Sequence, residues 1–241
     1  MKIEGRNSVY ELLKTDKNID KVLVQKDLKD EASKRLINVI KSNKIKIQLV
    51  DKYVIDKESE SNRSQGFIAF VSDYKYAELE DLIEDTKDRD GFIVILNEVL
   101  DPHNLGSIIR VCECAGVDGI VIGKDRSASV SDTVMRISEG ALNHIKVAKV
   151  TNINTAIDKL KDEGYWVYGA ETGGEDMYKT NLTGKICIVI GGEDSGVKRL
   201  TKTKCDAIIS IPMYGKINSL NASVACGVVV YEVVRQRNNK G

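Results

Sequence analysis

Near its C-terminus the chain reads Ser210-Ile211-Pro212-Met213-Tyr214-Gly215-Lys216-Ile217-Asn218-Ser219-Leu220-Asn221-Ala222-Ser223. The apolar run that starts at Ala207 predicts a short buried strand. Pro212 ends this strand because proline has no N–H to give to a ladder, and Asn221 or Ser223 can cap the helix that follows. This order of strand, polar loop and helix fits a ligand site in an α/β protein, and it fits an ordinary capped connection equally well.

Apolar runs alternate with helical periods throughout residues 91–241. Because the runs are continuously apolar, they predict parallel strands that are covered on both faces. The expected strands are 92–96, 119–122, 146–150, 165–168, 186–190 and 207–211, and the expected helices are 105–115, part of 131–142, 154–161 and 222–237. In the last helix, Val224, Val228, Tyr231 and Val234 share one face. The fold class is therefore α/β, a mainly parallel sheet with helices on both faces.

Residues 1–72 predict a separate small α/β unit. Strands are expected at 21–24, 45–49 and 66–71, with a helix at 29–42 and another capped by Asn7 or Ser8. Residues 73–90 predict an acidic linker with a short helix. The net charge is +4 for residues 1–72, −5 for the linker and +1 for the rest. A basic first block permits nucleic-acid binding, although a lysine-rich solvated surface would explain it equally well.

The composition excludes several classes of protein. The chain has no apolar run long enough for a membrane span, and its N-terminus lacks a signal-peptide core, so a cytoplasmic protein is expected. The odd number of cysteines, five, predicts reduced thiols, and the two histidines offer no metal-ligand spacing, so no metal site is expected. The dinucleotide-binding and phosphate-loop glycine patterns are missing, and so is a hydrolase nucleophile motif.

Three polar clusters each follow a predicted strand. The first is Asn104 with Arg110, the second is the 191–196 loop with Glu193, and the third is Ser219 with Asn221. Taken singly, each has an ordinary explanation as a helix cap, a solvated loop acid or a turn residue. Taken together at the carboxyl edge of one sheet, they predict a functional site. From these residues alone, the protein is a two-domain α/β protein with a late ligand site.

The three clusters resemble the three motifs of the SpoU-type (TrmH-type) RNA ribose methyltransferases of the SPOUT superfamily. The resemblance covers about 150 residues from Gly91 onward, through the motif Pro-His-Asn-Leu-Gly-x-x-x-Arg ending at Arg110 and the motif Ser-Leu-Asn-x-Ser starting at Ser219. Residues 1–72 resemble the ribosomal-protein-like RNA-binding domain of the RlmB-like subgroup, through segments 5–9 and 65–67. That subgroup usually has His where this chain has Ser64.

The resemblance implies a fold, a cofactor and an assembly. The fold is a SPOUT domain whose C-terminal segment makes a deep trefoil knot, which pattern analysis alone would not predict because knots are rare. S-adenosylmethionine would sit in the knot, and a homodimer would complete each site near the partner. The positions that match the cofactor contacts are Gly191, Ile211 and Leu220, with Gly169 and Ala170 beside them.

The implied activity is methyl transfer to a ribose 2′-hydroxyl of RNA, on a guanosine of large-subunit (23S) rRNA, with tRNA as an alternative. Arg110 would act as a base or as an electrostatic stabiliser, and the latter suits a guanidinium whose pKa exceeds about 12. Asn104 would position the ribose or Arg110, and Glu193 would fix Arg110 or Asn221. Ser219 and Asn221 would line the boundary between cofactor and substrate. The two rivals are a non-catalytic RNA-binding or ribosome-assembly protein and a small-molecule α/β enzyme.

Overall fold

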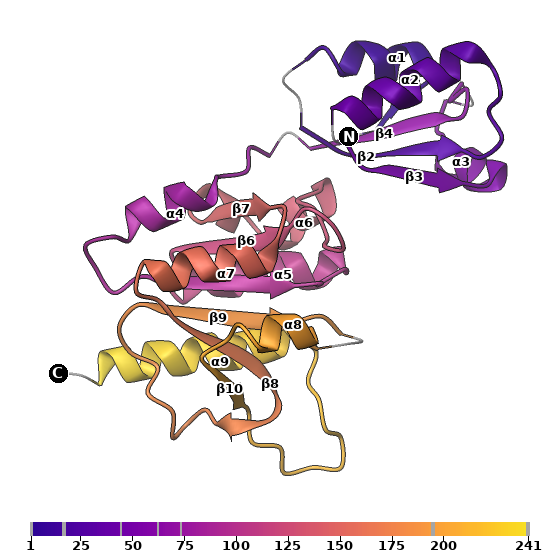
Figure 1. Cartoon of the computed structure of the whole chain (residues 1–241). Helices are drawn as coiled ribbons and strands as arrows, with labels where there is room; N and C mark the ends of the chain where they lie inside the picture. Colours follow the sequence, from indigo (N-terminus) through magenta and orange to yellow (C-terminus); the bar gives the residue numbers. More distant parts are fainter. Residues whose placement is uncertain are drawn as a thin grey trace. The chain divides into compact units, whose positions relative to one another are not determined.

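The computed structural model describes residues 2–15, 18–43, 45–61, 63–72, 74–193 and 196–239. The chain forms two units, Met1–Lys75 and Tyr76–Gly241, and each is described by itself. The first unit contains four strands and three helices within the described ranges (Figure 1). These elements are β1 (Lys2–Glu4), α1 (Arg6–Leu12), β2 (Asn18–Gln25), α2 (Glu31–Ser42), β3 (Ile47–Val50), α3 (Lys52–Glu58) and β4 (Phe67–Ser72).

A four-stranded mixed sheet of order β1-β4-β2-β3 forms the centre of the first unit. Residues of α1 and α2 pack with Val22, Val24 and Phe67 on one face, and α3 packs on the other face through Ile55. Strand β1 and helix α3 were not predicted from the sequence. The prediction that Asn7 or Ser8 caps α1 is wrong: the N-cap is Gly5 at φ 95°, a left-handed value that favours glycine, and the described residues provide no side-chain cap for this helix.

The second unit is built on a six-stranded, wholly parallel sheet of order β10-β8-β9-β5-β6-β7. Its elements are α4 (Leu79–Asp85), β5 (Phe92–Asn97), α5 (Pro102–Cys114), β6 (Gly119–Gly123), α6 (Asp132–Ile137), the short 3-10 helix η1 (Ala141–Asn143), β7 (Lys146–Val150), α7 (Ile153–Asp162), β8 (Trp166–Asp176), β9 (Ile186–Gly191), α8 (Arg199–Lys202), β10 (Ala207–Ser210) and α9 (Ala222–Asn238). The parallel sheet predicted from the continuous apolar runs is confirmed.

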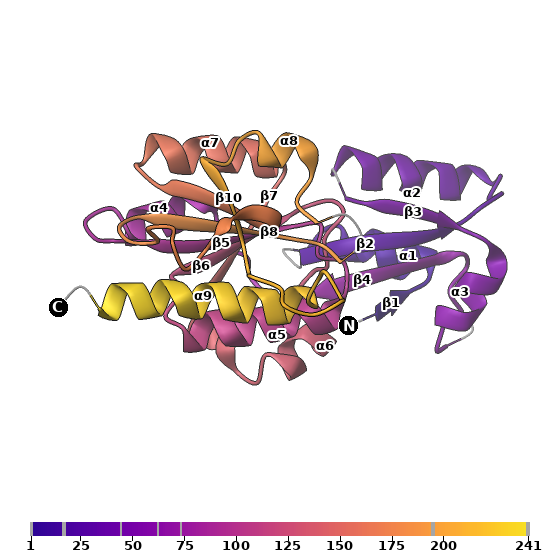
Figure 2. The same ribbon diagram turned by 90° about the horizontal axis from the view of Figure 1, so that it is seen from below.

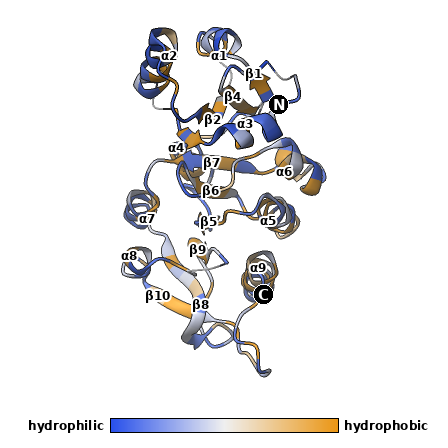
Figure 3. Ribbon diagram, turned by 90° about the vertical axis from the view of Figure 1, so that its right-hand side faces the viewer, coloured by the Kyte–Doolittle hydropathy of each residue, from blue (hydrophilic) through white to orange (hydrophobic). Residues whose placement is uncertain are grey.

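Helices cover both faces of this sheet. Helices α7 and α8 lie on one face, and α5, α6 and α9 lie on the other (Figures 2 and 3). The core on the α7 side includes Leu79 and Leu82 of α4, which is the short helix expected within residues 73–90. From Tyr76 onward that segment therefore packs as part of the second unit, and Asp73 lies outside the described residues.

Helix α9 is buried through a different face from the one that the sequence analysis named. Ala222, Cys226 and Val233 face the sheet and α5, and the Cys226 sulfur lies 3.9 Å from that of Cys112 on α5. Burial raises the pKa of the Cys112 thiol. Val224 is 51% exposed and Tyr231 48%, so the helix also presents an apolar stripe to solvent.

Candidate functional site

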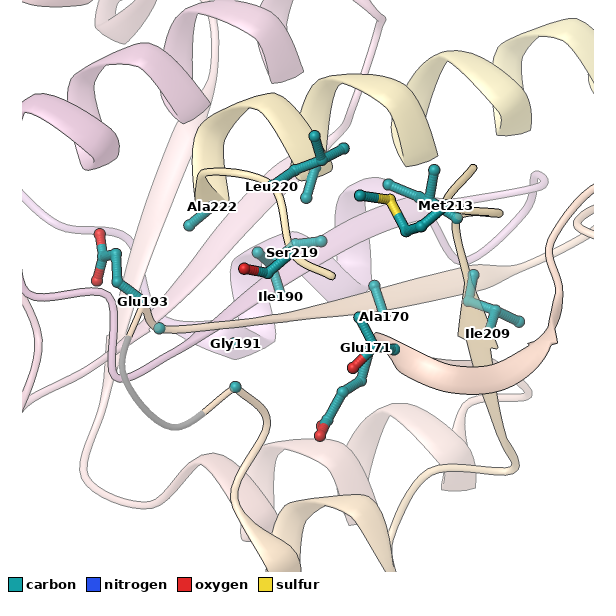
Figure 4. A pocket seen from close by; sticks show the side chains of 15 residues that line it. Ala170, Glu171, Ile190, Gly191, Glu193, Ile209, Met213, Ser219, Leu220 and Ala222 are labelled. Carbon is teal, nitrogen blue, oxygen red and sulfur yellow. The ribbon is translucent and has the colours of Figure 1, made fainter. Parts of the chain in front are cut away.

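A pocket opens where strands β8, β9 and β10 end and the chain turns towards α9 (Figure 4). Ser219, Leu220 and Ala222 lie on one side of it, and Ala170 and Glu171 lie on the other, in the middle of β8 where its pairing with β9 ends. The remaining lining residues are Thr172, Ile190, Gly191, Gly192, Glu193, Gly196, Ile209, Ile211, Met213 and Ala225. The pocket therefore lies at the carboxyl edge of the parallel sheet, where ligands of α/β proteins bind.

Two glycines let the loop after β9 fold back over the strand end. The Gly192 N–H donates to the Asn97 carbonyl at 3.0 Å, and the Gly196 N–H donates to the Gly192 carbonyl at 3.1 Å. A Cβ atom on Gly191 would overlap the backbone of Gly196 and Val197, and one on Gly192 would overlap the Glu98 carbonyl. The tight loop therefore requires glycine at both positions. Asp194 and Ser195 lie outside the described residues.

Asn104 and Glu193 come together at the rim of this pocket. Asn104 is buried, and its Nδ2 donates a hydrogen bond to Glu193 Oε1. The alternative of Asn104 as a simple helix cap is wrong, because Asp101 caps α5 by accepting from the His103 N–H at 2.9 Å. Helix α5 begins three residues earlier than expected, with Pro102 in its first turn. Asn104 therefore lies within the helix, and its side chain is available to bind the loop after β9.

Ser219 and Leu220 line the pocket, whereas Asn221 is used by its own helix. Asn221 Oδ1 accepts from the Ser223 N–H at 2.9 Å and from the Ser223 hydroxyl at 2.6 Å. Asn221 is the N-cap that the sequence analysis offered as one of two explanations. By fixing the start of α9, it holds Ser219 and Leu220 at the pocket.

Among the predicted cofactor positions, the structure brings Gly191, Ile211, Leu220 and Ala170 into the pocket lining. Gly169 is outside the lining. The space beside it is filled by Ile208 and Cys205, and a Cβ atom at Gly169 would lie 2.8 Å from Ile208 Cδ1. This glycine therefore allows the close approach of β10 to β8.

Arg110 lies away from this pocket in the single chain. Its guanidinium is 3.0 Å from Glu139, it is half-exposed, and it lines a second hollow between α5, α6 and α9. The physical reason is helical geometry, because six residues separate it from Asn104, about 9 Å along α5 and about 240° around it. The chain by itself does not bring Arg110 together with Asn104 and Glu193.

Glu171 is a pocket residue that the sequence analysis missed. Its carboxylate pairs with Lys202 on α8 and accepts a hydrogen bond from the Val197 N–H at 3.3 Å. Glu171 therefore anchors the C-terminal end of the glycine loop, residues 191–196. It was missed because the strand expected at 165–168 continues to Asp176 as β8. The pair Gly173-Gly174 was the sequence feature that could have indicated this irregular extension of the strand. A Cβ atom on Gly174 would overlap the Ile208 carbonyl, and the pairing register between β8 and β10 shifts after Ile208.

Comparison with known proteins places this architecture in a family. Residues 91–231 match the model of the SpoU rRNA Methylase family, and residues 2–77 match the model described as RNA 2'-O ribose methyltransferase substrate binding. The chain belongs to the SpoU/TrmH family of RNA methyltransferases. A "Putative TrmH family tRNA/rRNA methyltransferase" of Staphylococcus saprophyticus is 42% identical over 99% of this chain and 97% of its own length. This membership decides against the small-molecule enzyme that the residues alone left open.

Solved structures of similar fold include named SpoU and TrmH methyltransferases. The SpoU methyltransferase AviRb of Streptomyces viridochromogenes, in complex with its cofactor AdoMet, is 23% identical and covers 99% of this chain and 90% of its own, with a TM-score of 0.63. The TrmH/SpoU tRNA modifying enzyme of A. aeolicus is 28% identical over 68% of this chain and 86% of its own, with a TM-score of 0.57. In this SpoU/TrmH-family methyltransferase, the methylase match spans the three motif clusters and both hollows.

Proposed function

We propose that this enzyme transfers a methyl group from S-adenosylmethionine to a ribose 2′-hydroxyl of RNA, and that its target is a guanosine of large-subunit (23S) rRNA in the cytoplasm. The observation that carries the proposal is the Asn104–Glu193 hydrogen bond at the rim of a pocket formed by the glycine loop and the Ser219–Leu220 turn. The basic first unit, which matches a substrate-binding model, supports RNA as the substrate. The RlmB-like subgroup is a prediction within this proposal.

The pocket residues fit S-adenosylmethionine in polarity and charge. Ile190, Ile211 and Leu220 offer apolar contact for a nucleoside, and Gly191 presents no side chain to the pocket. The charged side chains among the described lining residues are the carboxylates Glu171 and Glu193, which suit a positively charged sulfonium. When bound, this donor supplies an electrophilic methyl group.

The residues of the chain would bind and orient the acceptor. Asn104, held by Glu193, would position the ribose whose 2′-hydroxyl oxygen takes the methyl group and gives up its proton to water, and Ser219 would separate the donor and acceptor sides of the pocket. Arg110 would stabilise the developing alkoxide and hold the adjacent phosphate, since a guanidinium is a poor base at neutral pH. Placement of the two reacting groups can contribute several kcal/mol to the barrier reduction.

A homodimer would bring Arg110 to a pocket from the partner subunit. Arg110 does not line the pocket of its own chain, and the exposed apolar stripe of α9 runs beside the hollow that contains it. Val224 and Tyr231 of this stripe are about half-exposed, as expected for a surface that a second copy covers.

The trefoil knot is also part of the proposal. Strand β10 lies at one edge of the sheet, whereas α9, which follows it, packs against β9 and α5 inside the unit. The connection 211–221 therefore carries the chain from the edge back past the ends of β8 and β9. Threading of this connection through the glycine loop would complete the knot.

The RNA target has one specific alternative. The Staphylococcus relatives are named for both tRNA and rRNA, so tRNA is the second candidate substrate. Mapping of ribose methylation in total RNA from cells with and without the protein distinguishes the two, because the lost modification identifies the RNA and the nucleotide.

Substitution of Arg110 by alanine tests the reaction. We expect Arg110→Ala to abolish labelled-methyl transfer to RNA while the calorimetric affinity for S-adenosylmethionine stays unchanged, because Arg110 lies outside the donor pocket of its own chain. Turnover near that of the wild type would refute the assignment of Arg110. Donor binding by the wild type without transfer to any RNA would instead favour the non-catalytic RNA-binding alternative.

A further inference from the structure

The second hollow contains two cationic side chains and one anionic one. It has a volume of about 550 Å³ and lies between α5, α6 and α9. Its charged residues are Arg110 of α5, Arg136 of α6 and Glu139, and Ser107 and Tyr231 add a hydroxyl and an aromatic wall. The net charge of this lining is +1, on the face of the sheet opposite α7 and α8 (Figure 2).

Close packing of α5 against α6 sets the spacing of these charges. A Cβ atom on Gly106 would lie 2.7 Å from Ile137 Cβ and 3.2 Å from the Val134 carbonyl, so glycine lets the two helices approach. Arg136 precedes Ile137 and Glu139 follows it by two residues, so this contact brings both into one hollow with Arg110, one turn further along α5. Gly106, the glycine of the Pro-His-Asn-Leu-Gly motif, thus sets the helix spacing that forms the hollow.

The two arginines differ in their partners. Arg110 is paired with Glu139 at 3.0 Å, whereas Arg136 makes no ion pair within the part of the chain that the structure describes. Arg136 is exposed in the last turn of α6. A guanidinium beside a second guanidinium is a strong site for a phosphate, which accepts the paired N–H donors of each.

We propose that this hollow binds a phosphate of the RNA strand next to the target nucleotide, with Arg136 as a second cationic ligand beside Arg110 and Glu139 as a counter-ion that the phosphate displaces. The proposal rests on the proposed function. It adds an RNA-binding residue, Arg136, which no motif assigns, and an acidic competitor, Glu139. Because Glu139 and the phosphate compete for Arg110, changes at Arg136 and Glu139 should act in opposite directions.

The test measures binding of a fluorescein-labelled RNA stem–loop over a series of salt concentrations. We expect Arg136→Gln to weaken binding several-fold and to reduce the slope of log affinity against log salt by about 1, as the loss of one phosphate contact does. Arg136→Lys should keep the slope. Glu139→Gln, which keeps the side-chain shape, should strengthen binding several-fold. The matched control is Arg199→Gln on α8, an exposed arginine on the other face of the sheet.

The outcomes separate this inference from the proposed function. Equal salt slopes for Arg136→Gln and Arg199→Gln, or weaker binding by Glu139→Gln, would overturn the inference even if the wild type transfers methyl groups normally. Dissociation of a dimer by Arg136→Gln with an unchanged salt slope would assign the hollow to the subunit interface and would also overturn it. Calorimetric affinity for S-adenosylmethionine should be the same in all variants. A wild-type protein that does not bind S-adenosylmethionine would contradict the proposed function and would leave the phosphate site untouched.

Discussion

Asn104 and Glu193 come from different motifs, yet a single hydrogen bond joins them at the pocket rim. An amide that donates to a carboxylate is a charge-assisted pair, and such a pair holds both groups in one geometry. Replacement of Asn104 by aspartate would put two carboxylates at this position, with no donor between them. The side chain would keep its size, so the change isolates the hydrogen bond from the packing of α5.

We therefore expect Asn104→Asp to lower the rate of methyl transfer at least tenfold, and Glu193→Gln in the same chain to restore part of it because the glutamine amide can donate to the new carboxylate. A double-mutant cycle on initial rates should give a coupling free energy of about 1–3 kcal/mol. Additive effects of the two substitutions would show that the bond does not position either group for the reaction.

Single residues also show which parts of the candidate site could be predicted from the sequence. The clusters around Asn104, Glu193 and Ser219 were recognisable because polar residues follow apolar runs, and parallel topology brings strand ends together. Gly191 was expected as a cofactor contact, and the structure adds that a side chain there would overlap the backbone of Gly196 and Val197. That loop contact depends on tertiary structure, and local sequence patterns carry no information about it.

At the scale of elements, one carboxylate ties β1 to the connection between α3 and β4. Glu4 accepts hydrogen bonds from the Ser59 hydroxyl at 2.6 Å, from the Glu60 N–H at 2.6 Å, and from the hydroxyl and N–H of Ser61. The Ser59 hydroxyl makes the largest contribution, followed by that of Ser61, and the donors together lower the pKa of Glu4 from 4.5 to about 2. A lowered pKa means that the folded state favours the charged carboxylate.

The stabilisation by Glu4 is therefore fully present above pH 4.5 and is lost as the pH falls towards 2. We expect Glu4→Gln to destabilise the first unit by about 1 kcal/mol at neutral pH, a value reduced by the solvent exposure of the group. The difference from the wild type should shrink below pH 4.5. Urea unfolding followed by circular dichroism measures it, and the fluorescence of Trp166, the chain's one tryptophan, provides a control in the second unit. An equal difference at pH 7 and pH 2 would contradict this role.

Helix α9 illustrates why an element can be predicted while its orientation is not. Its start at Ala222 and its Asn221 cap follow from the sequence, because capping is local. Its buried face does not, since apolar residues surround the helix and both Val224 and Val229 could face the core. The neighbours α5 and β9 select the face with Cys226 and Val233, and packing against them is a property of the fold as a whole.

At the scale of the whole molecule, the exposed stripe of α9 and the position of Arg110 make the same prediction. If the pocket of one subunit receives Arg110 from its partner, two different defects should complement each other in a mixed dimer. Arg110→Ala leaves the pocket intact. Ala170→Phe fills the pocket from β8 and leaves Arg110 intact. Each variant alone should form an inactive homodimer.

Mixing equal amounts under conditions of subunit exchange should restore about a quarter of the wild-type methyl transfer, because half of the dimers are mixed and each of these has one complete site. Light scattering would check that both variants remain dimeric, and a mixture of each variant with itself is the blank. An arginine that serves the pocket of its own chain predicts no recovery, since no subunit then has both an open pocket and Arg110. Recovery would therefore locate the reaction between subunits and explain why α5 carries Asn104 and Arg110 on different faces.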